Sequence, residues 1–525
     1  MLVSARQLDR TSLTADVAVV GAGAVGLAVA VDLARAGKTV LLLEAGGEVT
    51  ATQPPGRFDT GIARGYPLDG LRSGRARGLG GTTHLWAGQL VPLEPIVFEE
   101  RPWVTDAAWP LSNDELRPAY DRAYALLGLA AALPDAEVAR RLAIAPPTNA
   151  PDLELFFTRW TPQVNFARWF DEDIRCNERL FVVVDAPVTA VELGDDRATV
   201  TGFKARTPSG GEIVARAAHF VLANGTVEIA RLMSLPDADG VPPPWADNPW
   251  LGRGFVDHID AFAGKVTLTD AKRFHALFDG AFIGSLKYKA KLRLSADAQR
   301  RCRLVSAFAD FVFDSERVED LAVLKGFARG ILARQIDGSA LRTVIDQPKR
   351  LASLAGLAVP MVSRYVRHHR TYNPGDKGIR LRLSTEQKPV GNGRLRLLPE
   401  TDAFGVPAVE VEWAIDGEEV RAMAALSEAV AAFLREVGLA EVEIDPRLVE
   451  RDRAFLATID DANHQMGMAR LAEDPTRGVV DRDLKVFGTR NLFVAGAAVF
   501  PTTGAANPTL TAIALGLRMS AKLRS

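Results

Sequence analysis

Two residues near the C-terminus have the chemistry to activate a hydroxyl group. His464 lies in a glycine-containing turn, His-Gln-Met-Gly, and an imidazole with a near-neutral reference pKa suits a base that removes a proton. Asn507 precedes Pro508, which suits the first turn of a helix expected over residues 509–519, so Asn507 is expected at the N-cap. Its amide could then orient the oxygen that loses the proton. The alternative is that His464 is a structural histidine satisfied within its turn.

The first 44 residues have the element order of a dinucleotide-binding unit. An apolar run over residues 16–20 predicts a strand that leads directly into the motif GAGAVG, which starts at Gly21. An alanine-rich helix is expected up to residue 35, and a second strand over residues 39–43 ends at Glu44. The order of strand, glycine turn, helix, strand and acid indicates a Rossmann-like nucleotide site.

Each glycine of this motif has its own steric role. Gly21 allows the tight turn, Gly23 lets the backbone approach a pyrophosphate, and Gly26 lets the helix pack closely on the strand. The helix N-terminus faces the phosphates, and Glu44 can bind a ribose hydroxyl. The motif alone does not separate FAD from NAD, but the sequence Glu-Ala-Gly-Gly that starts at Glu44 is typical of flavoproteins.

A second glycine-rich stretch, residues 73–90, surrounds Trp86 with small residues. Small side chains beside an aromatic one suit a chain that passes close to a flat ring system, although a flexible surface loop is the alternative. His84 and Leu85 come directly before the tryptophan.

Taken together, these motifs resemble those of the glucose-methanol-choline (GMC) flavoprotein oxidoreductases, in particular the bacterial branch near pyranose and glycoside oxidases and dehydrogenases. The family motifs Asn-Leu-x-x-x-Gly, Pro-Thr and Asn-Pro-Thr-Leu-Thr are matched within residues 491–511, after a His-x-x-Gly turn at His464. The resemblance implies FAD-dependent oxidation of an alcohol to a carbonyl, with a sugar or glycoside as the expected substrate. It makes His464 and Asn507 the catalytic pair. Met468, Ala469 and Ala497 stand where the family often has polar residues.

The resemblance also implies how FAD is held. Some pyranose oxidases attach FAD through a histidine immediately before the tryptophan, but here that position is Leu85, and His84 is one residue early, so non-covalent FAD is expected. The expected cofactor-binding residues are Gly21, Gly23, Gly26, Glu44, Arg77, Gly80, Gly81, Thr82, Thr83, Trp86, Gly88, Val188, Ala223, Gly225, Gly496, Ala497, Asn507 and Thr509.

The middle of the chain is expected to cover the flavin. Runs over residues 379–386, 393–398 and 409–413 alternate like antiparallel strands, and Glu386 and Gln387 are candidates for binding substrate hydroxyls. His258, in a block that resembles one of the family, is expected to hold the crossing between domains by hydrogen bonds. A basic helical segment, residues 321–370, is interpreted as a cover over the active site, the alternative being a surface that docks a membrane or partner.

The expected fold class is α/β, with a Rossmann-like FAD-binding domain of the GMC and glutathione-reductase type. Its substrate domain has a mainly antiparallel sheet covered by helices. The FAD-binding domain is expected to be discontinuous, formed by residues 1–95, 176–260 and 451–525. Residues 96–175 would connect the domains, and residues 261–450 would form the substrate-binding domain.

Composition excludes several classes of partner. The chain has 525 residues and a net charge of -2, so its charge does not indicate binding to nucleic acid. Its two cysteines predict no disulfide framework and indicate a reducing, cytoplasmic location. Residues 492–517 are uncharged, but Pro501 and Pro508 interrupt them, so a buried strand, turn and helix is expected and no membrane association. No metal site is predicted. The electron acceptor could be oxygen, a quinone or a redox protein.

Other function classes are open at this stage. A nicotinamide dehydrogenase would explain residues 16–44 but not the C-terminal motifs, and an amine oxidase would lack the pair His464 and Asn507. A flavin-binding subunit without catalysis would resist reduction by any alcohol. Within the family, the substrate could be an aryl or aliphatic alcohol, or the chain could be a dehydrogenase subunit that passes electrons to a quinone or cytochrome.

Overall fold

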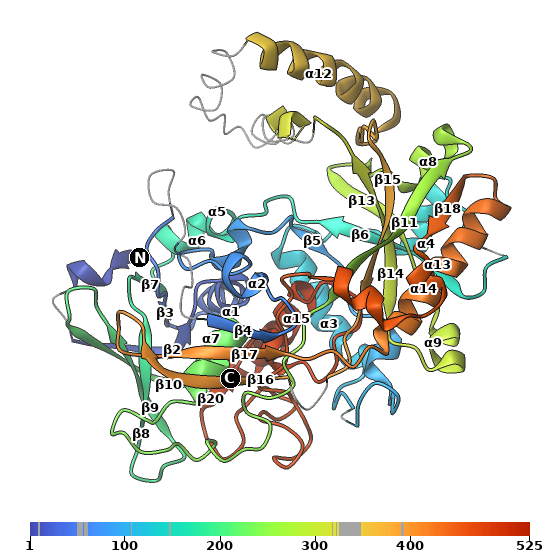
Figure 1. The fold of residues 1–525 in the computed structure, drawn as a ribbon. Coiled ribbons are helices and arrows are strands. Elements are labelled where there is room, and N and C mark those ends of the chain that lie inside the picture. The colour runs from blue at the N-terminus through green and yellow to red at the C-terminus, as the bar shows by residue number, and fades with distance from the viewer. Residues whose placement is uncertain are drawn as a thin grey trace.

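The computed structural model has two lobes that the chain crosses repeatedly (Figure 1). One lobe contains both chain ends, and the other contains the middle of the chain. The structure describes residues 1–8, 11–49, 56, 61–106, 108–145, 147, 149–317, 319–321, 323–324, 348–389 and 393–524.

The lobe with the chain ends is built on a sheet, hereafter the parallel sheet, whose order is β1-β7-β3-β2-β10-β9-β8, with β20 also paired to β10. Strands β3 and β2 pair in parallel with their neighbours β7 and β10. Their inner residues are apolar and buried, as expected for parallel strands covered on both faces. The bounds are β1 Leu2–Ser4, β2 Ser12–Val20, β3 Val40–Leu43, β7 Leu180–Val184, β8 Val188–Leu193, β9 Val200–Arg206, β10 Glu212–Leu222 and β20 Leu492–Val494.

Strands from distant parts of the sequence therefore meet in one sheet, which is the discontinuity expected of a Rossmann-like domain. Residues 212–222 form the single long strand β10. Its first residues pair with β9 and its last ones with β20, while β2 pairs along almost its whole length, and this continuous partner keeps it extended.

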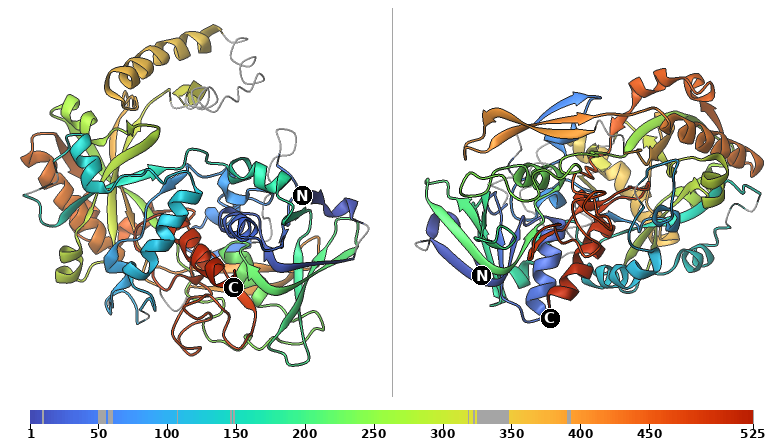
Figure 2. Two further views of the ribbon diagram at one scale, coloured as in Figure 1. Left: turned by 180° about the vertical axis from the view of Figure 1, so that it is seen from behind. Right: turned by 90° about the horizontal axis from the view of Figure 1, so that it is seen from below.

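Helices α1 (Ala24–Arg35) and α15 (Thr509–Leu523) lie side by side against the parallel sheet, as the view from below in Figure 2 shows. A Cβ atom on Gly516 of α15 would lie 2.8 Å from Cγ2 of Val29. The two helices therefore approach more closely than a larger residue would allow.

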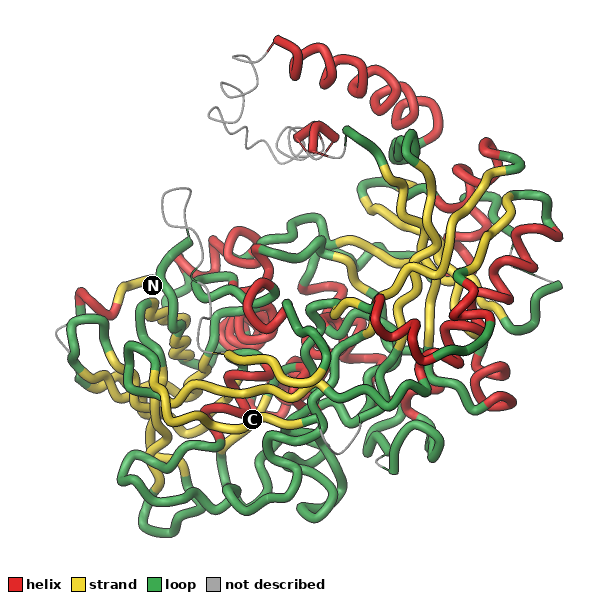
Figure 3. Tube along the Cα trace, in the orientation of Figure 1, coloured by secondary structure: helices red, strands yellow, loops and turns green. Residues whose placement is uncertain are grey.

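The second lobe is built on a sheet, hereafter the antiparallel sheet, with the order β18-β11-β15-β14-β13-β6-β5, in which β12 also pairs with β13 and β19 with β11. Helix α13 (Glu419–Glu436) packs on the face that carries Leu381 and Leu383. Figure 3 shows the strands of this lobe apart from those of the other. The bounds are β5 Gln89–Leu90, β6 Leu153–Trp160, β11 Ile259–Leu268, β12 Ala281–Ile283, β13 Leu286–Leu294, β14 Ala307–Asp314, β15 Gly378–Thr385, β18 Ala440–Ile444 and β19 Asp460–Asp461.

A third sheet corrects one expectation. Strands β16 (Arg394–Thr401) and β17 (Pro407–Trp413) were predicted to continue the sheet that contains β15. Instead they form a hairpin, and β17 pairs in parallel with β4 (Gly61–Gly65). The reason is that β15 already pairs with β11 on one side and β14 on the other, which leaves it no free edge.

The remaining helices connect the lobes or cap their edges. Ser112 and Glu115 form a capping box at the start of α3. The predicted basic segment is described only in part, because residues 322 and 325–347 lie outside the described residues. Its described helix, α12, projects beyond the antiparallel sheet (Figure 1), and its role as a cover stays a prediction. The bounds are α2 Gly70–Ser73, α3 Asn113–Leu126, α4 Asp135–Arg141, α5 Phe166–Trp169, α6 Asp171–Cys176, α7 Thr226–Met233, α8 Ala271–Phe278, α9 Ala296–Cys302, α12 Pro348–His368 and α14 Pro446–Val449.

Among the described residues, no helix combines the length and the apolar character that crossing a bilayer would require.

Candidate active site

A cleft runs along the carboxyl ends of the parallel strands β2, β3 and β10. This is the edge where open α/β sheets bind nucleotides. Most of the predicted cofactor residues line it: Gly21, Gly23, Glu44, Arg77, Gly81, Thr82, Val188, Ala223, Gly225, Gly496, Ala497 and Thr509.

The glycines of the first turn have the steric roles that the motif predicts. Gly21 has a φ of 96°, and a Cβ atom there would lie 2.6 Å from Cα of Asn224. A Cβ atom on Gly26 would lie 1.8 Å from the carbonyl oxygen of Gly21, so only glycine lets α1 pack on this turn. At Gly23 nothing lies within 4 Å of the added atom, so the backbone is open to the cleft.

The carboxylate of Glu44 holds the turns around the cleft together. It accepts hydrogen bonds from the backbone amides of Ala22 at 2.8 Å, and of Gly46 and Gly78 at 2.9 Å each. Burial raises its pKa despite these three bonds. A carboxylate has about four acceptor positions, so one position remains for the ribose hydroxyl that the sequence predicts.

An unsatisfied acceptor supports the fit of a dinucleotide in this cleft. The side-chain oxygen of Asn224 lines the cleft and is buried with no hydrogen-bond partner in the described part of the chain. Such an atom costs free energy unless a bound molecule donates to it, and a nucleotide offers several hydroxyl donors. Sequence reasoning missed Asn224, although it stands directly between Ala223 and Gly225, both of which were predicted.

Part of the second glycine-rich stretch, residues 80–88, is held in place by contacts with Val164 and Phe166. The hydroxyl of Thr83 donates to the carbonyl of Gly80 at 2.6 Å and accepts from the amide of Phe166 at 3.1 Å. The indole of Trp86 donates to the carbonyl of Val164 at 2.7 Å, and a Cβ atom on Gly88 would lie 2.6 Å from Cγ1 of the same valine. These contacts hold the loop in place, and the cofactor contacts of Gly80, Thr83, Trp86 and Gly88 stay predictions.

His84 is also engaged within this loop. One ring nitrogen, Nε2, donates to the carbonyl of Leu79 at 2.9 Å, so Nδ1 is left to accept from the side-chain amide of Asn165 at 3.2 Å. Both nitrogens therefore have protein partners.

The predicted pair His464 and Asn507 is brought together. The amide nitrogen Nδ2 of Asn507 lies 3.0 Å from Nε2 of His464. The expectation that Asn507 caps the final helix is wrong, because α15 begins at Thr509, Pro508 occupies the cap position, and no side chain caps the helix. Its side chain is consequently free to reach the imidazole, which a capping bond would have prevented.

A second histidine completes the site. Nδ1 of His258 lies 3.0 Å from Nδ1 of His464, and Nε2 of His258 lies 2.8 Å from the carbonyl oxygen of Gly504. His258 was expected to hold the domain crossing by hydrogen bonds, and one of these bonds is made to His464 itself. Sequence reasoning missed this contact because 206 positions separate the two histidines.

These bonds determine which nitrogen of each neutral ring carries the proton. A carbonyl oxygen only accepts, so Nε2 of His258 donates to Gly504, and its Nδ1 must accept from Nδ1 of His464. The second nitrogen of His464, Nε2, is then unprotonated and accepts from the amide of Asn507. The nitrogen beside Asn507 is therefore the one that can take a proton.

The surroundings keep His464 neutral before the reaction. Burial is the largest influence and lowers its pKa well below the usual value, and His258, Arg382 and Lys291 lower it further. The pKa of His258 is also lowered by its burial.

The turn that carries His464 is held by a buried carboxyl group. Oδ1 of Asp257 accepts from the backbone amides of His464 at 2.9 Å and Ala462 at 3.2 Å. Burial and the nearby Asp461 raise the pKa of Asp257 well above its usual value. Sequence reasoning missed this residue, although it stands next to His258.

Glu386 and Gln387 are corrected from substrate-binding to structural residues. The guanidinium of Arg101 binds both oxygens of Glu386 at 2.7 Å, and the backbone amide of Gly504 adds a bond at 3.0 Å. Gln387 accepts from the indole of Trp413 at 2.8 Å. Both side chains are fully buried with protein partners, so neither is exposed to a substrate.

Comparison with known proteins agrees with this geometry. A family model described as FAD dependent oxidoreductase matches residues 16–244, and one described as GMC oxidoreductase matches residues 389–516. The large subunit of fructose dehydrogenase from Gluconobacter japonicus is 24% identical, over 97% of this chain and 98% of that one. A C-glycoside 3-oxidase from Microbacterium trichothecenolyticum is 33% identical over 23% of this chain and 22% of its own.

A solved structure shares the fold. The crystal structure of pyridoxine 4-oxidase from Mesorbium loti is similar with a TM-score of 0.60 and 18% identity, over 97% of this chain and 98% of that chain. The two family models, the cleft that fits a dinucleotide and this common fold lead to one assignment. The chain belongs to the GMC family of FAD-dependent oxidoreductases, which act on alcohol groups.

Proposed function

We propose that the protein oxidises a CH–OH group of a sugar or glycoside to a carbonyl, with His464 as the base. The observation that carries this proposal is the unprotonated Nε2 of His464 beside the amide of Asn507. The names of two relatives, a fructose dehydrogenase subunit and a C-glycoside 3-oxidase, support the substrate class.

The residues of the chain divide the work of the reaction. Nε2 of His464 takes the hydroxyl proton, and Asn507 donates a hydrogen bond that orients the same oxygen. His258 receives the Nδ1 hydrogen bond of the imidazolium and keeps the ring in place. FAD held in the cleft would supply the acceptor for the hydride that leaves the carbon.

An anaerobic titration tests the proposal. Purified protein with bound FAD is mixed with pyranoses and aryl glycosides while the visible flavin band is followed, and a sugar is expected to bleach the band. In His464→Ala the bleaching rate should fall by about 10²- to 10⁴-fold, the usual contribution of a general base. His368→Ala, on the exposed surface of α12, is the matched control and should bleach like the wild type.

The outcomes test the substrate class and the assignment of the base separately. Bleaching by an aryl or aliphatic alcohol but by no sugar would keep the reaction and overturn the substrate class. Unchanged bleaching by sugar in His464→Ala would overturn the assignment of the base.

We further propose that the FAD is held without a covalent bond, since both ring nitrogens of His84 have protein partners. Acid precipitation is expected to release the yellow cofactor into the supernatant, and a flavin that stays with the pellet would contradict this. For the electron acceptor, oxygen, quinones and redox proteins are the proposed classes. The rate at which each reoxidises the bleached enzyme distinguishes them.

A further inference from the structure

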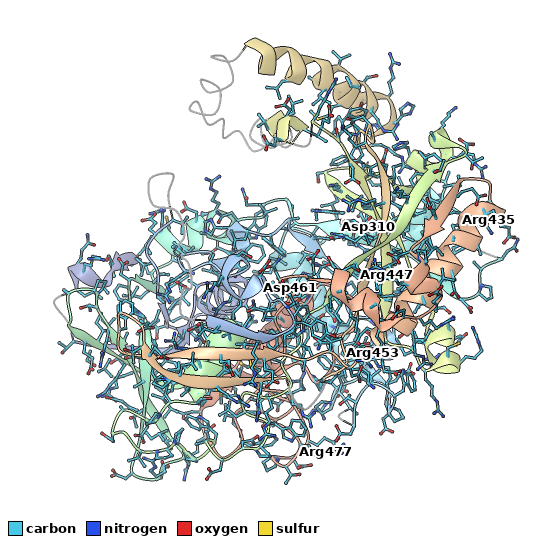
Figure 4. The ribbon with its side chains drawn as sticks, in the orientation of Figure 1. Asp310, Arg435, Arg447, Arg453, Asp461 and Arg477 are labelled. Atoms are coloured by element: carbon cyan, nitrogen blue, oxygen red, sulfur yellow. The ribbon has the colours of Figure 1, made fainter. Side chains whose placement is uncertain are left out.

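A charged group of side chains lies on the face of the antiparallel sheet opposite to α13. On β15 Arg382 alternates with the buried leucines 381 and 383, so it points away from that helix. Arg382 pairs in register with Asp310 of β14. Figure 4 labels Asp310 on this sheet and Asp461 in the segment that leads to His464.

The ion pairs within this group differ in length. Nζ of Lys289 lies 2.5 Å from Oδ1 of Asp310, which is a close ion pair. Lys291 lies 3.4 Å from the other oxygen, and Arg382 contacts Asp310 at 3.4 Å and Asp260 at 3.7 Å. Arg382 therefore has only long ionic contacts, in contrast to the bidentate pair that Arg101 forms.

Two atoms of the group have no partner. Nε of Arg382, a donor, and Oδ1 of Asp260, an acceptor, are both buried without a hydrogen bond to any of the described residues. Leaving such groups unpaired is costly, and more so when they are charged. Arg382 and Asp260 contact each other through their remaining atoms, so the unpaired donor and acceptor belong to neighbouring side chains.

This group adjoins the proposed catalytic pair. Asp260 stands two residues after His258, at the start of β11. The positive charges of Arg382 and Lys291 contribute, after burial and His258, to the low pKa of His464. A molecule beside His464 is therefore within the electrostatic reach of the group.

We propose that Asp260 and Arg382 are the specificity-determining residues of this site and bind neighbouring hydroxyl groups of a neutral polyhydroxylated substrate. The inference rests on the proposed function, because it places the reacting carbon at His464. A hydroxyl both donates and accepts, so a pair of adjacent hydroxyls satisfies the unpaired carboxylate oxygen and the unpaired guanidinium nitrogen together.

Charge also selects among polyols. Three cations, Lys289, Lys291 and Arg382, face two carboxylates, Asp260 and Asp310, so the group has a net positive charge. An aminosugar carries a further positive charge and is repelled, whereas a neutral sugar is not. The site therefore prefers a neutral sugar to its amino derivative.

The test compares substrates in the FAD-loaded protein. The value of kcat/KM is measured for a pyranose that bleaches the flavin, for its monodeoxy and amino derivatives, and for cyclohexanol, which has a single hydroxyl. In the wild type, removal of the hydroxyl next to the oxidised carbon should lower kcat/KM by about 10-fold or more, as expected for a lost bond to a charged group.

The variants assign the effect to residues. Asp260→Ala and Arg382→Met should each lower the ratio of kcat/KM for the pyranose to that for cyclohexanol by about 10-fold or more. Arg380→Met is the matched control, because Arg380 lies two residues away on the same strand face and pairs with Asp314 at 2.6 Å. The control should leave the ratio within about 2-fold of the wild type, inside the range of a change outside the site.

The possible failures are distinguishable. If no sugar bleaches the wild-type flavin, the proposed function fails. If sugars bleach it but the deoxy derivatives and both variants show unchanged ratios, this inference fails and the proposed function stands. Preference for the amino derivative would also overturn the inference. Because the deoxy comparison uses the wild type alone, it remains decisive if a variant does not fold.

Discussion

At the scale of single residues, His464 differs from many catalytic histidines in what accepts its Nδ1 proton. In a serine protease triad a carboxylate has this role, whereas here it is the neutral imidazole of His258. A neutral partner orients the ring and selects its tautomer, but it stabilises the imidazolium less than an anion would. The low pKa of His464 follows from this arrangement together with its burial.

Replacing His258 tests its positioning role. His258→Ala should lower kcat by about 10- to 100-fold, because the ring of His464 is then free to rotate and to adopt the other tautomer. His258→Gln offers one acceptor and one donor and should recover part of the loss. FAD absorbance serves as the control for folding, and equal kcat values for the alanine and glutamine variants would contradict a positioning role.

The pH dependence of the reaction gives a second prediction. Because the pKa of His464 is lowered well below 6.5, the base is already unprotonated at neutral pH. We expect kcat/KM to be constant from neutral to mildly alkaline pH and to fall only as the pH drops through the lowered pKa. In Lys291→Met the fall should begin at higher pH, since one cation near His464 is removed. A wild-type inflection at or above the ordinary histidine value would contradict this.

At the scale of elements, α13 carries a buried acid at its first residue. Glu419 is fully buried, and its carboxylate accepts from the backbone amides of Lys388 at 3.1 Å and Gly417 at 3.2 Å. Burial raises its pKa to about 7. A raised pKa means that the folded protein holds this proton more tightly than the unfolded chain, so the stability it contributes is lost as pH rises.

This shift predicts a measurable pH dependence of stability. Between pH 4 and pH 8, the unfolding free energy of the wild type relative to Glu419→Gln should fall by about 3 kcal/mol, because only the wild type must ionise this group. Denaturant unfolding of both proteins at several pH values measures the difference. A difference that does not change with pH would contradict the raised pKa.

The glycine turn before α1 leaves no space for a side chain at Gly26. Gly26→Ala should yield protein without FAD or with greatly reduced stability, since the new methyl group overlaps the carbonyl of Gly21. Gly194→Ala is the control, because its added atom would meet Thr201 at an ordinary 3.4 Å. The ratio of flavin to protein absorbance after purification reports the result, and normal FAD content in Gly26→Ala would contradict the steric argument.

At the scale of the whole molecule, one buried ion pair links three distant segments. Arg101 binds Glu386 after β15, and Glu386 in turn accepts from the amide of Gly504, whose carbonyl holds His258. The ion pair is almost completely excluded from solvent, with side-chain exposures of 1% and 0%. Arg101 and the neighbouring amides keep the pKa of Glu386 low even though burial alone would raise it.

Breaking this pair should affect stability and activity together. Arg101→Ala leaves a buried carboxylate without its cation, which is expected to cost about 3–5 kcal/mol of unfolding free energy. It should also lower kcat, because Gly504 and His258 lose a fixed position. Arg435→Ala, which removes an exposed ion pair with Glu441, is the control and should cost about 1 kcal/mol or less. Equal losses in the two variants would contradict the structural role.

The sequence by itself determined the features that depend on local spacing. The glycine turn with Glu44 and the order of elements near Asn507 each lie within a few dozen residues. Local chemistry decides them, as glycine does where a Cβ atom would overlap the backbone. The family motifs at the two chain ends added the pairing of His464 with Asn507.

Only the tertiary structure decided which distant residues meet. The contact of His258 with His464, the burial of Glu386 by Arg101 and the pairing of β17 with β4 join segments far apart in the sequence. A glutamate at the end of a predicted strand reads as exposed until its partner is known, because burial depends on what packs against it. For the same reason, the charged face of Asp260 and Arg382 follows from strand register, which no local pattern specifies.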